Sequence, residues 1–259
     1  MDGSDILQPI SYETRNLGTT AFALSNSFIE SPDPEALATA IATEELSHDR
    51  IFVQARIPKA ANRTVFLIQP LGFYFVEATV SPQTRLFKNK TLEQFLSDPS
   101  TFIPAKYPPE SIAVEMMEEV DFETAEIIRA IARSSFIDDR FHIDAKCSNS
   151  IADTRFVYWI EDLLTSEETV FYVLNYKDET AGFMARKAEN LILAGFSEKY
   201  RNSGFGDFLW LSVLAHMRTL AFKKAHTLIS TNNVSVLNLY ARLGFQFKNP
   251  EATLHYWSR

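Results

Sequence analysis

The hydrophobic pattern divides the first half of the chain into alternating strand-like and helix-like stretches. Short runs rich in β-branched and aromatic residues predict strands, and longer runs with apolar residues every three or four positions predict helices. We expect strands at residues 22–28, 50–57 and 73–80, and helices at residues 34–46 and 59–69. This alternation favours an α/β fold.

The pattern is interrupted in the middle of the chain. After Pro82 the sequence becomes polar, includes a short helical candidate at residues 91–98, and passes through Pro104, Pro108 and Pro109. Proline-rich polar stretches are typical of connections between domains. We therefore interpret this segment as a linker and expect two domains, at residues 1–111 and 112–259.

The second half restarts with a strand at residues 113–117 and a helix at 122–133, for which Asp121 is a plausible N-cap. A helix at 151–164 follows, and then three consecutive antiparallel strands at 169–175, 180–187 and 189–196. A long amphipathic helix at 205–223 and a strand at 226–231 come next. The prediction is an α/β (α+β) domain.

A glycine-rich turn opens that long helix, with the sequence Arg201-Asn202-Ser203-Gly204-Phe205-Gly206. Glycine lets the main chain approach an anion, and first-turn N–H groups have no partner inside the helix, so the turn can bind a pyrophosphate. Turns of this composition also occur without ligands. ATP and NAD are disfavoured, because Gly206 is followed by Asp207 instead of the P-loop lysine and no Gly-x-Gly-x-x-Gly is present.

A second motif follows the strand at 226–231. Asn233 stands seven residues before Tyr240, and Gly244-Phe245 comes four residues after Tyr240. Alone, this motif is equally typical of an amphipathic helix whose tyrosine packs in the core and whose glycine ends it. Together and in this order, the two motifs resemble the GNAT superfamily of acetyl-CoA-dependent N-acetyltransferases. The resemblance implies a GNAT fold with a mixed central sheet.

The resemblance implies a site. The strand at 189–196 would diverge from its neighbour, so that the main chain of Ala194, Gly195 and Phe196 holds the thioester, with an N–H near Phe196 stabilising the oxyanion. Residues 201–206 would bind the pyrophosphate, Asn233 would hold the CoA arm, and Tyr240 would protonate the leaving thiolate. The general base is left open between ordered water, Glu189 and His142, and the length of the acyl group is also open. The sequence departs from the family at Ser197-Glu198, where proline is frequent.

The first half contains an echo of the second motif. Residues 62–73 and residues 234–245 both end in Leu-Gly-Phe after a helical stretch. The first copy lacks the glycine-rich turn, and it has Leu67-Ile68 where the second has Leu239-Tyr240. We therefore expect residues 1–111 to form a partial GNAT-like domain that binds no cofactor.

The acceptor is expected near a polar stretch between the first two helices of the second half. Arg140, His142 and Asp144 lie there, and this stretch resembles the acetyltransferases of the dTDP-fucosamine (dTDP-4-amino-4,6-dideoxy-D-galactose) type, which implies a nucleotide-linked amino sugar as acceptor. A local ion pair and a structural histidine are the alternatives, and Phe156 and Trp159 are expected in the core. The competing functions are acetylation of a peptide, protein N-terminus or small amine, and non-catalytic binding of acetyl-CoA.

Composition narrows the functional classes. The chain has 259 residues, 46% of them hydrophobic, and a formal net charge of −8, which disfavours nucleic-acid binding because phosphate contacts need a basic face. Cys147 is the single cysteine, so no intrachain disulfide is expected, and no Cys/His spacing indicates a metal. No signal peptide or membrane span is indicated. We expect a cytoplasmic protein without membrane or nucleic-acid partners; whether it forms a homodimer is left open.

Overall fold

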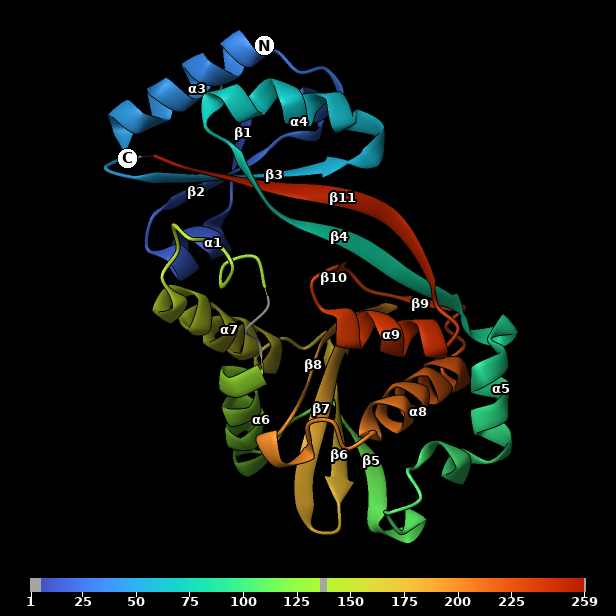
Figure 1. Cartoon of the computed structure of the whole chain (residues 1–259). Coiled ribbons are helices and arrows are strands. Elements are labelled where there is room, and N and C mark those ends of the chain that lie inside the picture. The colour runs from blue at the N-terminus through green and yellow to red at the C-terminus, as the bar shows by residue number, and fades with distance from the viewer. Residues whose placement is uncertain (1–5, 136–138, 259) are drawn as a thin grey trace.

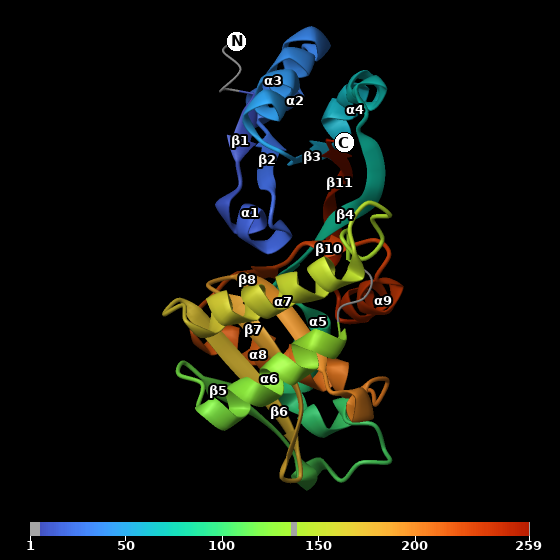
Figure 2. The same cartoon turned by 90° about the vertical axis from the view of Figure 1, so that its left-hand side faces the viewer.

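The computed structural model describes residues 6–135 and 139–258, and it forms two lobes joined by one mixed sheet (Figures 1 and 2). Within these residues the sheet has eleven strands in the order β1-β2-β3-β11-β4-β9-β8-β7-β6-β5, with β10 paired to β4. We call the part around β1, β2, β3 and β11 the first lobe, and the part around β5 to β9 the second lobe. An α/β fold with a mixed sheet is therefore confirmed.

Apart from β11, the first lobe is built from elements before residue 69. These are β1 (Leu7–Pro9), α1 (Ser11–Leu17), β2 (Thr20–Leu24), α2 (Asn26–Glu30), α3 (Pro34–Ser47), β3 (Ile51–Pro58) and α4 (Asn62–Ile68). The helices α3 and α4 lie beyond the sheet at the end of the molecule where the C-terminus is found (Figure 1).

The second lobe and the two long strands follow. They are β4 (Tyr74–Arg85), α5 (Lys90–Ser97), β5 (Ile112–Met117), α6 (Phe122–Ser135), α7 (Asn149–Leu164), β6 (Thr169–Tyr176), β7 (Glu179–Lys187), β8 (Asn190–Phe196), α8 (Phe205–Thr219), β9 (Lys224–His226), β10 (Ile229–Ser230), α9 (Val234–Arg242) and β11 (Gln246–Trp257). The helices and strands predicted for residues 113–223 match these elements closely. Residues 226–231 form part of two short strands instead of one, and β11 was not predicted.

The predicted strand at residues 22–28 is wrong in its second half. The chain leaves β2 at Leu24, and the Ser25 hydroxyl accepts a hydrogen bond from the Phe28 N–H at 3.2 Å, which caps α2. Phe28 and Ile29 are buried although they lie in a helix. Because both residues are apolar, the sequence pattern looked like a continuation of the strand. Ser25 was the signal that a helix begins here.

The two long strands connect the lobes. β11 lies between β3 and β4 in the first lobe, whereas the C-terminal part of β4 pairs with β9 in the second lobe (Figure 1). β4 thus follows α4 of the first lobe and reaches the second lobe, whereas β11 follows α9 of the second lobe and lies in the first lobe. Each of the two strands begins after a turn of the same kind. Gly72 precedes β4 with a φ of +98°, and Gly244 precedes β11 with a φ of +77°; both values favour glycine.

The segment interpreted as a linker contributes to the core of the second lobe, so that interpretation is wrong. Leu86, Leu92 and Phe95 are buried against the apolar face of α8. Conversely, Leu254 of β11 belongs to the core of the first lobe. The division at residue 111 remains a prediction, but each core contains residues from both sides of it.

Candidate functional site

The strands β8 and β9 diverge from each other. They are parallel and meet at Asn190 and His226, where the His226 N–H donates to the Glu189 carbonyl at 3.0 Å. Beyond this point a cavity of about 210 Å³ separates them. Ala194 of β8, Trp210 of α8 and Tyr240 of α9 line this space, which we call the strand-gap cavity.

The main chain of β8 presents free polar groups to the gap. The Ser197 N–H donates to the Ala181 carbonyl of β7 at 2.9 Å, and Phe196 lies opposite Gly182. Along an antiparallel strand, successive residues direct their N–H groups to opposite sides. The N–H groups of Ala194 and Phe196 therefore point away from β7, toward the gap.

Tyr240 is buried beside this cavity, with 3% of its surface exposed. Its ring meets Trp210 edge-on at 6.1 Å and Phe245 at 4.7 Å between centroids. Burial raises the pKa of the Tyr240 hydroxyl to about 12, against smaller opposing effects of hydrogen bonding to Trp210 and Thr227. The phenol is therefore protonated at neutral pH and able to donate a proton.

Asn233 is the N-cap residue of α9 and also lines the strand-gap cavity. Its side-chain oxygen accepts a hydrogen bond from the Val236 N–H at 3.2 Å and caps the helix. Capping uses the oxygen of the side chain as acceptor and does not require the amide N–H groups. Asn233 is thus both a structural residue and a candidate ligand contact.

Residues of the glycine-rich turn at 201–206 make contacts that stabilise the fold and could not be recognised from the sequence. Gly204 has a φ of +91°, and a Cβ atom there would lie 2.6 Å from Cγ of Pro104. Arg201 donates to the Ser134 carbonyl at 2.5 Å and so joins the turn to the end of α6. The Ser203 hydroxyl accepts from the Phe205 N–H at 3.2 Å. Glycine at 204 is therefore required by backbone conformation and by Pro104, whatever the turn binds.

A larger cavity of about 640 Å³ lies between the lobes and adjoins the strand-gap cavity. The two share Asp139, Phe156 and Trp159, together with residues 191–192 and 227–230. We call it the inter-lobe cavity. Its wall combines aromatic side chains with charged ones, the latter being Arg56, Glu77, Asp139, Arg140, Arg155, Asp162 and Lys187.

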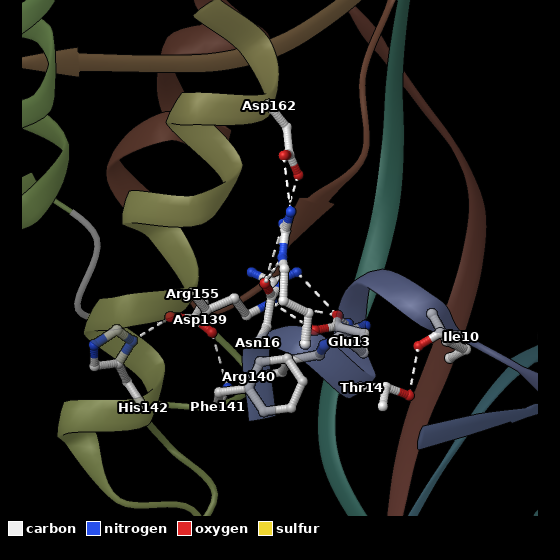
Figure 3. Close-up of polar contacts among 11 residues, drawn as sticks. Ile10, Glu13, Thr14, Asn16, Asp139, Arg140, Phe141, His142, Arg155 and Asp162 are labelled. Carbon is white, nitrogen blue, oxygen red and sulfur yellow. Dashed lines mark hydrogen bonds and ion pairs between the residues drawn. The ribbon is translucent and has the colours of Figure 1, made fainter. Parts of the chain in front are cut away.

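Arg140 lines the inter-lobe cavity and is tied to the first lobe (Figure 3). Its guanidinium donates to the Glu13 carboxylate of α1 at 2.5 Å, and Arg155 of α7 donates to the same carboxylate at 3.1 Å. Burial alone would raise the pKa of Glu13, but the two arginines outweigh burial and lower it. The buried carboxylate is therefore ionised and holds both arginines in place.

His142 and Asp144 do not line either cavity in the described part of the chain, which differs from their expected role at the acceptor. His142 lies between Asp139 and Asp153 (Figure 3 shows the Asp139 contact). Asp144 is 2% exposed and accepts from Tyr74 at 2.6 Å, from His255 at 2.7 Å and from Trp257 at 2.9 Å. Asp144 therefore binds the loop to β4 and β11, and its carboxylate is not available to a ligand.

Sequence reasoning missed the contribution of the first lobe to this region. Arg56 and Glu77 lie in β3 and β4, and both line the inter-lobe cavity. An arginine and a glutamate inside otherwise apolar strand runs were the available signal.

Glu189, one proposed base, instead faces Lys224 at 3.3 Å. Cys147 is buried, and burial raises the pKa of its thiol to about 11, so it is not a reactive thiolate.

Residues 133–245 match the acetyltransferase (GNAT) family. The chain carries a GNAT acetyltransferase domain. No curated protein matches the chain by sequence. Residues 133–245 are therefore an acetyltransferase domain of the GNAT type, which uses acetyl-CoA as its cosubstrate.

Solved structures share the fold of the whole chain. A GCN5-related N-acetyltransferase from Sphaerobacter thermophilus is 12% identical, with a TM-score of 0.61 over 94% of this chain and 74% of that one. A tandem GNAT protein from the clavulanic acid biosynthesis pathway is also 12% identical, with a TM-score of 0.58 over 93% and 76%. A conserved protein of unknown function from Staphylococcus epidermidis is 9% identical, with a TM-score of 0.59 over 97% and 91%. A two-lobed GNAT fold therefore accounts for both halves of the chain.

The residues present fit acetyl-CoA. The diverging strands leave main-chain N–H groups of Ala194 and Phe196 without partners in β7, and the first turn of α8 directs N–H groups out of the helix. No cluster of metal-ligating side chains occurs among the residues that the structure describes, and no helix in residues 6–135 and 139–258 has the length and apolarity needed to cross a membrane.

Proposed function

We propose that the protein transfers an acetyl group from acetyl-CoA directly to the amine of a small acceptor that occupies the inter-lobe cavity. The observation that carries this proposal is the continuity of the two cavities: the strand gap with Tyr240 opens beside a larger, charged cavity. A thioester in the gap and an amine in the inter-lobe cavity would then be neighbours, and no covalent enzyme intermediate is needed.

Three groups of the chain have roles in this proposal. The thioester is the acyl donor when acetyl-CoA is bound. The Phe196 N–H is expected to stabilise the oxyanion that develops on its carbonyl. Tyr240 would donate its proton to the departing thiolate, because burial keeps the phenol protonated. Residues 201–206, Gly195 and Asn233 would hold the remainder of the cosubstrate.

Glu77 is our candidate for the proton acceptor, directly or through water. It lines the inter-lobe cavity and is 5% exposed. Burial raises the pKa of its carboxyl group, and a hydrogen bond with Ser230 and the nearby Arg140 and Arg56 offset only part of that rise. A carboxylate with a raised pKa is a stronger base than an exposed one. This assignment replaces Glu189 and His142, which lie outside both cavities.

A nucleotide-linked amino sugar is the acceptor that we favour. The inter-lobe cavity combines the aromatic side chains of Tyr12, Phe156 and Trp159 with arginines near Arg140. Aromatic faces suit a base, and arginines suit phosphates. A peptide or protein N-terminus is the alternative acceptor, and non-catalytic binding of acetyl-CoA is the alternative function.

Turnover of acetyl-CoA against a panel of amines tests the proposal. The panel contains amino-sugar nucleotides, polyamines and peptides, and the release of free CoA thiol is measured together with the mass of the product. Acetylation of a small amine is expected. Acetyl-CoA binding by calorimetry without acetylation of any member would support the non-catalytic alternative, and preference for the peptides would refute the assignment of the inter-lobe cavity.

A further inference from the structure

Several buried polar atoms of residues that line the inter-lobe cavity have no hydrogen-bond partner among the described residues. They are Nε and Nη1 of Arg140, Nε of Arg56 and Oγ1 of Thr79. Arg140 and Thr79 are each 3% exposed, and all three residues line this one cavity. A buried donor that stays unpaired costs about 1–3 kcal/mol, and more when it is charged. Donors gathered in one cavity are therefore suited to a ligand that accepts from them.

The strand register places these groups on one face of the first-lobe sheet. Thr253 of β11 lies opposite Arg56 on one side and opposite Glu77 on the other. Thr79 is two residues beyond Glu77 and so points to the same face. Arg140 approaches from the loop before α7, held there by its ion pair with Glu13 (Figure 3). Two elements thus converge on the cavity, the sheet from one side and the loop from another.

The charges around this face are not balanced by the chain itself. Three arginines, Arg56, Arg140 and Arg155, face two carboxylates, Glu13 and Glu77. Asp139 and Asp162 also line the cavity, but they pair with His142 and Arg15, and Lys187 adds a further positive charge. Glu13 is shared between Arg140 and Arg155. Burial lowers the pKa of Arg140 to about 10, and repulsion from Arg56 and Arg155 adds to the effect. Arg140 remains charged at neutral pH, and a bound anion would relieve the repulsion.

We propose that Arg140, Arg56 and Thr79 form a subsite for an acid group, a carboxylate or a phosphate, that the amine acceptor carries. The inference rests on the proposed function, because it assumes that the acceptor occupies the inter-lobe cavity. Guanidinium groups match the two oxygens of a carboxylate or phosphate with paired hydrogen bonds. The protein therefore selects amines with an acid group over neutral amines of the same skeleton.

The first test measures anion binding without any acetylation. Inorganic phosphate and acetate are titrated into the protein saturated with CoA, which is expected to occupy the turn at residues 201–206. The variant is Arg56→Gln, because Arg140 also holds Glu13, and the matched control is Arg63→Gln, an exposed arginine of α4 with the same change of charge. We expect Arg56→Gln to weaken binding at least about tenfold, the loss of one charge-assisted hydrogen bond, and Arg63→Gln to leave it unchanged. Equal binding in all three proteins would overturn the subsite.

The second test compares matched acceptors. Ethanolamine is paired with phosphoethanolamine and propylamine with β-alanine, so that one pair reports on phosphate and the other on carboxylate. We expect kcat/KM to be at least about tenfold higher for the acidic member of one pair, and this preference to disappear in Arg56→Gln but not in Arg63→Gln. Equal use of neutral and acidic amines would overturn the subsite and leave the acetyltransferase proposal intact. Anion binding that depends on Arg56, without acetylation of any amine, would support the subsite and refute the proposed function.

Discussion

Replacement of Tyr240 by phenylalanine separates chemistry from packing at this site. The substitution removes one oxygen and keeps the ring that contacts Trp210 at 6.1 Å and Phe245 at 4.7 Å. Loss of the buried hydroxyl should cost about 1 kcal/mol of folding free energy, which corresponds to about 2–4 °C in Tm for a protein of this size. Acetyl-CoA affinity, measured by calorimetry, should change little, because the ring still forms the wall of the strand-gap cavity.

Turnover should respond far more than stability. A general acid contributes about 10² to 10⁴ in rate, or about 3–5 kcal/mol of activation free energy. The loss should appear equally in kcat and kcat/KM, because the proton is donated in the transition state. Because burial raises the pKa of Tyr240 to about 12, the phenol is protonated below that pH, and the wild-type rate should show no loss from this group between pH 6 and 9.

The matched control is Tyr172→Phe. Tyr172 is a buried tyrosine of the same lobe whose hydroxyl contacts His216 at 2.7 Å and accepts from Arg186 at 2.9 Å, and it does not line the strand-gap cavity within the described chain. It should lose stability and keep its turnover. If Tyr240→Phe is folded and turns over within a factor of two of wild type, Tyr240 is a packing residue and solvent protonates the thiolate.

Three further predictions concern the fold. Gly204→Ala should lower the free energy of unfolding, measured by urea unfolding, by at least about 1 kcal/mol, because φ is +91° and Pro104 occupies the space of a Cβ atom. The control is Gly206→Ala, whose Cβ would meet Leu239 at an ordinary 3.5 Å and which should show no such loss. Burial lowers the pKa of His255 to about 4, so the unfolded chain takes up a proton first as the pH falls through about 6.5, and stability should fall between pH 6.5 and 4; His255→Gln should reduce this slope by about one proton, and an unchanged slope would refute the assignment. Residues 112–259 expressed alone should not fold cooperatively, because they leave β11 without β3 and β4; a sharp thermal transition by circular dichroism would contradict this.

Most helices and strands of the second lobe could be predicted from the sequence, including β8, α8 and α9, which surround the candidate site. The period of apolar residues gave the helix that begins at Phe205 and the strand that ends at Phe196, because burial of one face requires that period. Tyr240 falls on the buried face of α9 for the same reason. The interpretation of Asp144 was less successful, since a polar residue in a loop gives the same pattern whether it faces a ligand or holds the loop to a distant strand.

Tertiary structure decided what the short-range pattern could not contain. The contact between Arg140 and Glu13 joins residues 127 positions apart, and the sharing of β4 and β11 between the lobes depends on pairings across more than 160 positions. Such pairings are specified by the complementary surfaces of whole elements and not by the periodicity within any one of them. The sequence by itself therefore determined most helices and strands of the second lobe and the glycine-rich turn, while only the folded chain brought the arginines and Glu77 of distant segments around one cavity.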